Sequence, residues 1–312
     1  MAPAIEVRDL VKRYRKGTVN AVDGVSFDVE QGQFFALLGP NGAGKTTTIS
    51  ILTTTLGLTS GSVKIAGHDV VREASRVRRE VGIIFQSPSL DMNLTGEENI
   101  RFHAVLYGLY PYRPMYRLMP VEYRRQIADL ADVVGLGAEI FKPVRRMSGG
   151  MRRKLEIIRG LMHHPRVLFL DEPTSGLDTA SRRNLWQYIG DLRKQNDITI
   201  CLTTHQLNEA EDADRVCIID HGRVIAMGGP HEVKSDLAHE TLHIDAADRS
   251  VLRQRLHALN VPFREDGHFV VRLDDRTAYE VVHAIDQPLT MLRTESATLE
   301  DAYIRLLAEE DA

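Results

Sequence analysis

The stretch GPNGAGKTT (Gly39–Thr47) decides the fold, because it joins a buried strand to a helix through a glycine-rich turn. It fits the pattern G-x-x-x-x-G-K-[ST], follows the apolar run QFFALL and opens the helical pattern KTTTISILTTTLG. A loop of this kind turns its backbone N–H groups inward at the N-terminus of a helix, where they bind phosphate oxygens. Gly42 and Gly44 allow the backbone to make this turn. A chance glycine turn is the alternative, and the strand and helix on either side count against it.

The pattern predicts a site for a nucleotide and a magnesium ion. Lys45 neutralises the β- and γ-phosphates in such a loop, and the hydroxyl of Thr46 binds Mg²⁺. The nucleotide-binding residues expected here are Gly39, Pro40, Asn41, Gly42, Ala43, Gly44, Lys45, Thr46 and Thr47.

Two adjacent carboxylates end the apolar run RVLFLDEP at residues 166–173. A hydrophobic strand does not normally close on two acids unless a cation or a reaction lies beside them. Asp171 suits a role with Mg²⁺, direct or through another ligand, and Glu172 can polarise a water for in-line attack on the γ-phosphate. The alternative is a solvated strand end before Pro173.

The composition of the chain restricts its domain organisation and its possible partners. The 312 residues are 43% hydrophobic, which predicts one large domain and a smaller one. The net charge of -4 favours neither nucleic acid nor an anionic membrane overall, so any charge-driven contact must be local. The N-terminus carries charges where a signal peptide is apolar, and no apolar run reaches the ~18 residues that span a bilayer. Cys201 and Cys217 lie in apolar runs and are interpreted as core residues.

The distribution of apolar residues predicts an α/β fold. Residues 5–14 and 21–30 alternate apolar and polar side chains, which is typical of antiparallel strands with one solvated face. The runs QFFALLG, RVLFLDE and ITICLTTH are continuously apolar, as in strands buried on both faces of a mainly parallel sheet. Helical patterns dominate from about 88 to 165 and predict an inserted helical subdomain, in which Thr95 and Glu98 fit a capping box.

A second domain follows the turn cluster Gly228-Gly229-Pro230. We place the main domain at residues 1–232 and a small accessory domain at 233–312. The segments after the turn follow the order β-α-β-β-α-β, which is the ferredoxin-like α+β arrangement.

The ordered motifs resemble the nucleotide-binding subunits of ATP-binding cassette (ABC) transporters. MSGGM at 147–151 resembles the ABC signature, and SGLD at 175–178 resembles the D-loop. VGIIFQ ends on Gln86 as the Q-loop does, and CLTTH ends on His205 as the switch histidine does. The resemblance covers about residues 5–230. It implies a P-loop NTPase of the ABC cassette type, with a mainly parallel core sheet, an antiparallel β-subdomain and an inserted helical subdomain.

The resemblance also implies roles for single residues. Tyr14 would stack on adenine, and His205 would contact the γ-phosphate. Gln86 would contact the attacking water, Mg²⁺ and the membrane subunit, and Asp178 would act across a dimer. Taken singly, these residues also fit edge-strand packing, a strand-end histidine, a surface polar residue and a helix cap, respectively.

In this family two subunits enclose two ATP molecules head to tail. Ser148 and the backbone N–H groups of Gly149 and Gly150 would meet the γ-phosphate bound by Lys45 of the other subunit. The flanking Met147 and Met151 stand where the family more often has Leu and Gln, and the loss of the Gln amide removes a polar contact near the ribose.

The stretch LYGLYPYRPMYRLMP at residues 106–120 adds length to the helical subdomain. Its three prolines forbid a continuous helix. It fits a surface excursion, a docking element for a membrane partner, or a base-stacking element beside Arg113 and Arg117.

The resemblance implies the ATP-hydrolysing motor of an ABC exporter. Its partners would be a second ATP-binding subunit, giving a homodimer, and a separate multispan permease, with no nucleic acid. Its place would be peripheral, on the cytoplasmic face of the cell membrane. Daunorubicin-resistance-type drug exporters and their polysaccharide or nodulation-factor relatives are the most similar subgroup. A non-transport ABC ATPase acting on nucleic acid or ribosomes, and an importer ATPase, remain the alternatives.

Overall fold

The structure is a computed structural model that describes residues 2–15, 17–84, 89–174, 179–204, 206–237, 241–273, 276–295, 298–300 and 302–303. The chain divides into two compact units, Met1–Met227 and Gly228–Ala312. The boundary predicted after residue 232 falls inside a helix, α7 (Pro230–Leu237), which the sequence pattern did not predict. None of the described helices is long and apolar enough to cross a membrane.

The first unit holds two sheets and the helices between their strands. Its strands are β1 (Ile5–Lys12), β2 (Val22–Val29), β3 (Phe34–Leu38), β4 (Ser60–Ile65), β5 (His68–Asp69), β6 (Val81–Ile84), β7 (Val167–Asp171), β8 (Thr199–Thr204), β9 (Arg215–Asp220) and β10 (Arg223–Gly228). Its α-helices are α1 (Lys45–Leu52), α2 (Ala74–Glu80), α3 (Gly96–Leu106), α4 (Val121–Val133), α5 (Gly149–Leu161) and α6 (Thr179–Asn196). Short 3-10 helices are η1 (Tyr116–Leu118), η2 (Gly137–Phe141), η3 (Val144–Arg146) and η4 (Leu207–Ala210).

The central sheet is mainly parallel, which confirms the α/β prediction. Its strand order is β10-β9-β3-β8-β7-β6, and β3 pairs in parallel with both β8 and β9. β7 pairs in parallel with β8 and β6. The smaller sheet has the order β2-β1-β4-β5, and its strands pair antiparallel, as the alternating pattern predicts. The carboxyl ends of β3, β8 and β7 therefore meet at one edge of the central sheet.

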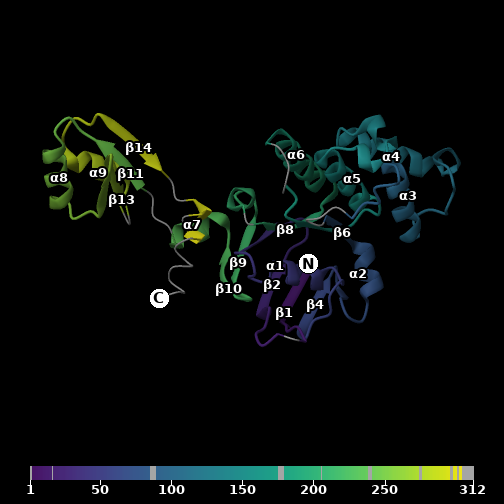
Figure 1. Cartoon of the computed structure of the whole chain (residues 1–312). Helices are drawn as coiled ribbons and strands as arrows, with labels where there is room; N and C mark the ends of the chain where they lie inside the picture. The colour runs from purple at the N-terminus through teal and green to yellow at the C-terminus, as the bar shows by residue number, and fades with distance from the viewer. Residues whose placement is uncertain are drawn as a thin grey trace. The chain divides into compact units, whose positions relative to one another are not determined.

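The main core lies between the two sheets. The central sheet has the smaller sheet, α1 and α2 on one side and α5 and α6 on the other (Figure 1). Buried apolar side chains of β1, β2, β4 and α1 form one cluster with β3, β7 and β8, in which Phe27 stacks on Phe35 with ring centroids 5.0 Å apart. Cys201 and Cys217 are buried in this cluster, which confirms their interpretation as core residues. Burial raises the pKa of both thiols.

Helix α1 is shorter than the pattern KTTTISILTTTLG predicts. It ends at Leu52, and Thr54 adopts a positive φ of 61°. The Thr53 hydroxyl donates to the Ile49 carbonyl at 2.8 Å, and the Thr55 hydroxyl donates to the Ser50 carbonyl at 2.8 Å. Threonine hydroxyls compete with backbone groups for the carbonyls of a helix, so the threonine run ends the helix.

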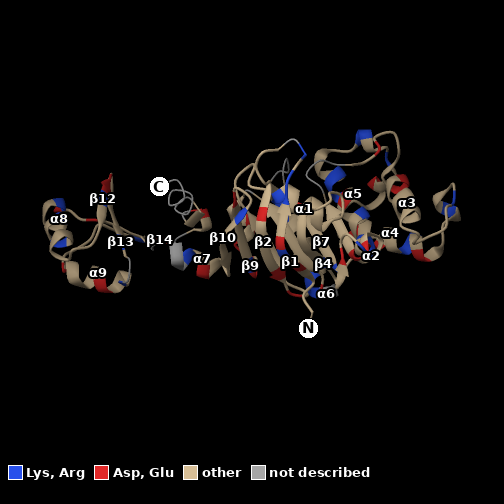
Figure 2. Cartoon of the chain, turned by 90° about the horizontal axis from the view of Figure 1, so that it is seen from below, with Lys and Arg blue, Asp and Glu red and all other residues tan. Residues whose placement is uncertain are grey.

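The helical subdomain contains α3, α4 and α5. The predicted capping box is present at the start of α3, where Thr95 accepts from the Glu98 amide and the Glu98 side chain accepts from the Thr95 amide. No α-helix forms between Tyr107 and Pro120, as the prolines predict; the only helical turn there is η1. Basic and acidic residues are interspersed over the elements of each unit (Figure 2), in keeping with the small net charge.

The second unit has the predicted ferredoxin-like order. Its elements are β11 (Thr241–Asp245), α8 (Arg249–Ala258), β12 (Phe263–Asp266), β13 (His268–Arg272), α9 (Ala278–Ile285) and β14 (Met291–Glu295). The strand order is β12-β13-β11-β14 with antiparallel pairing, which is the split βαβ topology. Leu242, Leu252, Phe269 and Val281 belong to one buried cluster between the sheet and its two helices.

Candidate nucleotide-binding site

Two positions in the loop after β3, Gly39 and Gly44, accommodate only glycine. Gly39, Gly42 and Gly44 have φ values of 154°, 89° and 104°. A Cβ atom on Gly44 would lie 2.4 Å from the Ala21 carbonyl oxygen, and one on Gly39 would lie 2.2 Å from the Ile219 carbonyl oxygen. Close backbone approach and positive φ together require glycine there. This is the conformation that directs loop amides toward a bound phosphate.

Lys45 is the first residue of α1 and lies back over the loop. Its Nζ atom donates to the carbonyl oxygens of Gly39 at 2.7 Å and Pro40 at 2.9 Å. Burial lowers the pKa of Lys45, and the carboxylates of Glu172 and Asp171 oppose that shift. The predicted phosphate-binding lysine and the predicted carboxylate pair therefore lie close enough for their charges to interact.

Strand β8 connects the loop to the carboxylates. The sheet register places Leu38 opposite Thr204, and Thr203 opposite Asp171. The Thr203 hydroxyl donates to Asp171 Oδ1 at 2.5 Å. Burial raises the pKa of Asp171, while this hydrogen bond acts in the opposite direction. Asp171 is thus a buried carboxylate in fixed orientation at the edge where β3 ends.

Glu172 lies at the point where β7 leaves the sheet. Its amide donates to the Thr203 carbonyl at 2.9 Å, and its φ of 45° turns the chain away from the strand direction. A positive φ on a non-glycine residue is uncommon and is found at functional sites. The side chain of Glu172 is half-buried, in contrast to the buried Asp171.

Tyr14 lies beside the start of α1. Its Oη atom is 3.2 Å from Thr47 Oγ1, and Lys12 Nζ lies 5.5 Å from the centroid of its ring. The side chain is 47% exposed, so the ring presents a face to solvent next to the phosphate-binding loop. An exposed aromatic ring in this place suits base stacking.

The Ser-Gly-Gly corner forms the N-terminus of α5. Ser148 is the N-cap, and its Oγ accepts from the Met151 amide at 3.2 Å. The first intrahelical bond runs from the Arg152 amide to the Ser148 carbonyl at 3.0 Å, so the amides of Gly149 and Gly150 precede it. A Cβ atom on Gly149 would meet nothing within 4 Å. No hydrogen bond between described residues joins this corner to the loop after β3.

Three predicted site residues, Gln86, Asp178 and His205, lie outside the described residues. The elements beside them are placed: β6 ends at Ile84, β8 ends at Thr204 and α6 begins at Thr179.

Sequence reasoning missed a buried ionic network on α5. Glu156 is 0% exposed, and its carboxylate lies 3.1 Å from Arg153 Nη1 and 3.6 Å from Arg159 Nη2. Arg153 Nε donates to the Pro173 carbonyl at 2.7 Å, and Nη2 donates to the Glu172 carbonyl at 3.2 Å. The guanidinium of Arg153 thereby holds the backbone that carries the carboxylate pair.

The other end of this network holds Ser89. The Ser89 amide donates to Glu156 Oε1 at 3.0 Å, and Arg159 donates to the Ser89 carbonyl and hydroxyl at 2.7 Å each. Opposite charges three residues apart at 153, 156 and 159 were the available sequence signal. That spacing is common on solvated helix faces, so it did not indicate burial.

A second missed residue is Glu209 on η4. Its buried carboxylate accepts a hydrogen bond from the Thr204 hydroxyl at 2.7 Å and another from the Thr174 hydroxyl. It therefore connects the end of β8 with the segment that follows the carboxylate pair. The only sequence signal for this contact is an acid soon after a predicted strand.

The fold and site define a nucleotide-binding cassette. A phosphate-binding loop and a carboxylate pair lie at one edge of the central sheet. The inserted helical subdomain contains α5, whose N-terminus is formed by Ser-Gly-Gly. The ABC transporter family model matches residues 22–175. The chain belongs to the family of ABC transporter ATP-binding proteins, and it is an ATP-binding ATPase subunit. The family, the cassette fold and the ATPase class predicted from the sequence are confirmed.

Relatives and solved structures agree with this assignment. The chain is 41% identical to the daunorubicin/doxorubicin resistance ATP-binding protein DrrA of Streptomyces peucetius, covering 87% of this chain and 81% of that one. It is 36% identical to the Nod factor export ATP-binding protein I of Ralstonia nicotianae, covering 99% and 95%. A solved ATP-binding subunit of an ABC transporter has a TM-score of 0.66 at 30% identity, covering 75% of this chain and 92% of that one. The dimeric bacterial cassette MJ0796 has a TM-score of 0.64 at 25% identity, covering 72% and 98%.

Proposed function

We propose that this chain is the ATP-hydrolysing motor of an exporter, working as a dimer beneath a separate membrane permease on the cytoplasmic face. The observation that carries the proposal is the joint placement of Lys45, Asp171 and Glu172 at the edge where β3, β8 and β7 end. The names of the relatives, resistance and export ATP-binding proteins, support transport out of the cell. A drug or a lipid- or polysaccharide-like molecule is the proposed cargo class.

The proposed nucleotide site extends from Tyr14 to the carboxylate pair. The loop from Gly39 to Thr47 would bind the phosphates through its amides, and Tyr14 would stack on the base. The Lys45 ammonium now bonded to two loop carbonyls would bind the β- and γ-phosphate oxygens.

We propose that Thr46 and Asp171 hold Mg²⁺, with Gln86 as a further ligand from the family resemblance. Among the described residues, no cluster of three or more His, Cys, Asp or Glu could hold a metal. A magnesium ion keeps waters and phosphate oxygens and needs only one or two protein ligands, so a hydroxyl and one carboxylate fit it. When bound, the ion would neutralise charge on the phosphates.

We propose Glu172 as the general base. Its half-exposed carboxylate can accept a proton from a water that attacks the γ-phosphorus, while Asp171 stays buried and oriented by Thr203. The bond from the γ-phosphorus to the bridging oxygen breaks, and ADP and phosphate leave. Gln86 would orient the water and His205 would contact the γ-phosphate.

The dimer proposal rests on the Ser-Gly-Gly corner. Ser148 caps its own helix, and Gly149 and Gly150 present amides that begin the helix. The space beside Gly149 is open, so a phosphate held by the partner subunit can approach these amides. Asp178 is proposed to contact the same partner.

Lys45→Ala is expected to weaken ATP binding about 10- to 100-fold, because one or two charge-assisted hydrogen bonds to phosphate are lost. Fluorescent-nucleotide titration measures the affinity. Lys142→Ala, on an exposed lysine paired with Glu139, is the matched control and should leave it unchanged. Unaltered affinity and turnover in Lys45→Ala would remove the loop from the nucleotide site.

Ser148→Arg is expected to leave ATP binding by the single subunit intact and to abolish ATP-dependent dimerisation, because a long cation fills the corner that the partner's nucleotide must enter. Light scattering with size-exclusion chromatography in ATP measures the dimer. Ser62→Arg, at an exposed serine of β4, serves as the control. A dimer of normal stability in Ser148→Arg would contradict the proposed contact.

Transport itself is tested with the permease. The full chain should co-purify with a multispan membrane protein, and in vesicles that carry both, ATP should drive cargo away from the side where this chain binds. Movement toward that side would contradict export while leaving the ATPase assignment in place.

A further inference from the structure

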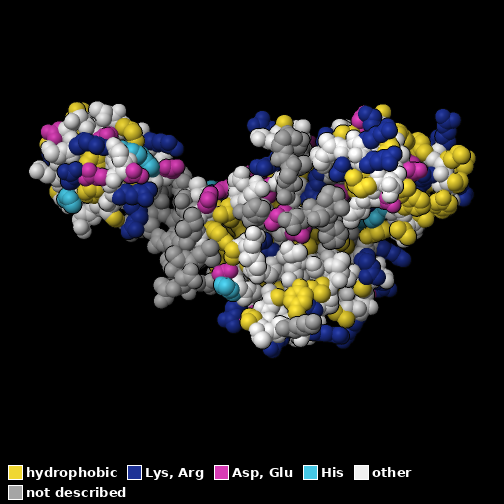
Figure 3. Space-filling view, in the orientation of Figure 1, with side chains coloured by type: hydrophobic (Ala, Val, Ile, Leu, Met, Phe, Trp, Pro, Cys, Tyr) yellow, Lys and Arg dark blue, Asp and Glu magenta, His cyan; other side chains and the backbone are white. Residues whose placement is uncertain are grey.

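The end of α3 and the segment between α3 and α4 present exposed apolar and basic side chains together. Leu106, Tyr112, Met115 and Leu118 are 84%, 53%, 64% and 56% exposed. The exposed Arg113 and Arg117 lie among them in sequence. We call these six residues the basic apolar surface. Hydrophobic side chains gather over this end of the helical subdomain, with basic side chains at their border (Figure 3). Contiguous exposed apolar patches with a polar rim mark protein- or membrane-interaction sites on soluble proteins.

The local charge of this surface is opposite to that of the whole chain. Residues 99–121 contain no Asp or Glu, although the chain has 43 acidic residues and a net charge of -4. Both arginines of the surface are exposed, and the Arg113 guanidinium bonds only to the adjacent Tyr112 carbonyl, at 3.2 Å, among the contacts of described residues. An anionic partner would therefore meet two cations and no opposing acid from this segment.

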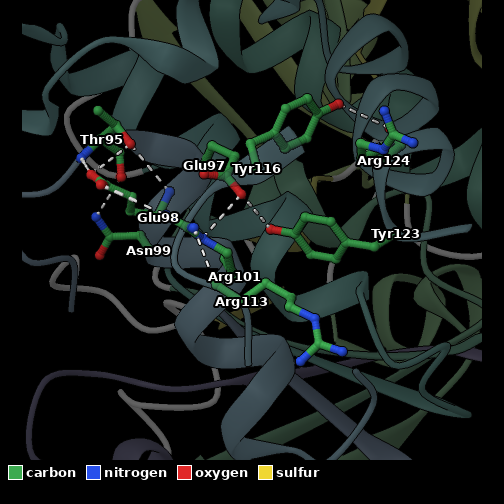
Figure 4. A network of polar contacts seen from close by, with 9 residues as sticks. All are labelled: Thr95, Glu97, Glu98, Asn99, Arg101, Arg113, Tyr116, Tyr123 and Arg124. Carbon is green, nitrogen blue, oxygen red and sulfur yellow. Dashed lines mark hydrogen bonds and ion pairs between the residues drawn. The ribbon is translucent and has the colours of Figure 1, made fainter. Parts of the chain in front are cut away.

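The surface is held from beneath by a buried network (Figure 4). Arg101 Nη1 donates to the Arg113 carbonyl at 3.0 Å. Glu97 lies 3.3 Å from Arg101 Nε and accepts from the Tyr123 hydroxyl at 3.0 Å. Glu97, Arg101 and Tyr123 are all buried. The buried ion pair orients Arg101, and its hydrogen bond to the Arg113 carbonyl holds the backbone from which the Arg113 side chain extends.

Three tyrosines of the segment have two different roles. Tyr110 donates to Gln126 Oε1 at 3.0 Å, and Tyr116 donates to the Arg124 carbonyl at 3.3 Å, so both fasten the segment to α4. Tyr112 points outward and stacks on Phe102, with ring centroids 6.1 Å apart. The exposed side chains therefore extend from a segment that is hydrogen-bonded to α4.

We propose that the basic apolar surface binds the anionic headgroup layer of a lipid bilayer. Tyrosine at the headgroup level and arginine paired with lipid phosphates are the side chains that membrane interfaces favour. Exposed Leu and Met side chains can enter the acyl boundary, as they do in interfacial segments. Each arginine near an anionic surface adds about fivefold to the affinity. The contact is weak alone and adds to the attachment through a permease, since a tethered site has a high effective concentration.

The inference deepens the proposed function, since a membrane-bound motor places this surface near lipid, but its test does not depend on transport. The purified full chain, without permease, is mixed with phosphatidylcholine vesicles that contain or lack phosphatidylglycerol, and bound protein is measured by flotation. We expect binding to the anionic vesicles that falls as salt rises, and little binding to the neutral ones. Equal binding to both vesicles, or none to either, would overturn the inference.

Two variants assign the binding to the surface. Arg113→Glu/Arg117→Glu should reduce affinity for anionic vesicles at least about tenfold, and Tyr112→Ser/Met115→Ser should reduce it at every salt concentration. Arg72→Glu/Arg79→Glu, at exposed arginines next to and within α2, is the matched control and should retain most of the binding. Three results would refute a lipid partner. The control variant could lose as much binding as the surface variants, or the first variant could bind as well as the unchanged chain. Binding could also appear only when permease is present in the vesicles.

ATPase turnover is measured in the same samples. The surface variants should hydrolyse ATP at the normal rate, because none of these residues lies in the nucleotide site. Vesicle binding by a chain without turnover would leave this inference standing while the proposed function failed.

Discussion

Glu172→Gln is expected to lower ATP turnover by about 10²- to 10⁴-fold, the usual contribution of a general base. Glutamine has the same shape and can still accept a hydrogen bond, but it cannot take the proton of the attacking water. The amide of residue 172 keeps its bond to the Thr203 carbonyl, so the turn after β7 remains. ATP affinity should be unchanged, because the loop and Lys45 are intact. Single-turnover release of phosphate and nucleotide titration measure the two quantities.

The same variant should accumulate an ATP-bound dimer, since the γ-phosphate proposed to join the two subunits is no longer removed. Sizing in ATP and in ADP separates this state from simple aggregation. Glu122→Gln, on the exposed face of α4, is the matched control and should turn over normally. Turnover at the normal rate in Glu172→Gln would assign the base to another residue.

Glu156→Gln is expected to destabilise the first unit by about 3–5 kcal/mol, the usual cost of leaving a buried charge without its partner. Glu156 is 0% exposed and lies between Arg153 and Arg159. Burial lowers the pKa of both arginines, and Glu156 is the main opposing charge. A neutral amide would remove the main opposing charge from two buried guanidinium groups. Urea unfolding followed by the fluorescence of Trp186, the only tryptophan in the chain, reports on this unit.

The control for Glu156 is an ion pair of the same type on the surface. Arg125 and Asp129 are 3.9 Å apart on α4, with side chains 83% and 69% exposed. Asp129→Asn should change stability by less than about 1 kcal/mol, because exposed pairs are hydrated and screened. Similar losses for both variants would show that burial does not decide the strength of the α5 network.

The sequence predicts the local structure around the candidate site well, because each motif is a short stretch with fixed spacing. Strand, loop and helix around Gly39 follow from periodicity and glycine placement, and Asp171 follows from an apolar run that ends in acids. The ferredoxin-like order of the second unit is also confirmed, since its elements are short, separate and strongly patterned.

What the sequence could not predict depends on contacts between distant segments. Arg153 bonds to carbonyls some twenty positions along the chain, and Glu156 bonds to the amide of Ser89. Glu209 joins hydroxyls that no local pattern connects. The early end of α1 was missed for another reason, since threonine hydroxyls that bond back to carbonyls override a helical pattern.

The shared acceptor Glu209 has a mechanical consequence. Because one rigid carboxylate receives hydrogen bonds from both Thr174 and Thr204, neither backbone can shift without straining the bond to the other. The start of the segment after β7 and the end of β8 are therefore mechanically coupled through one side chain, so a displacement of either backbone is transmitted to the other within the same protomer.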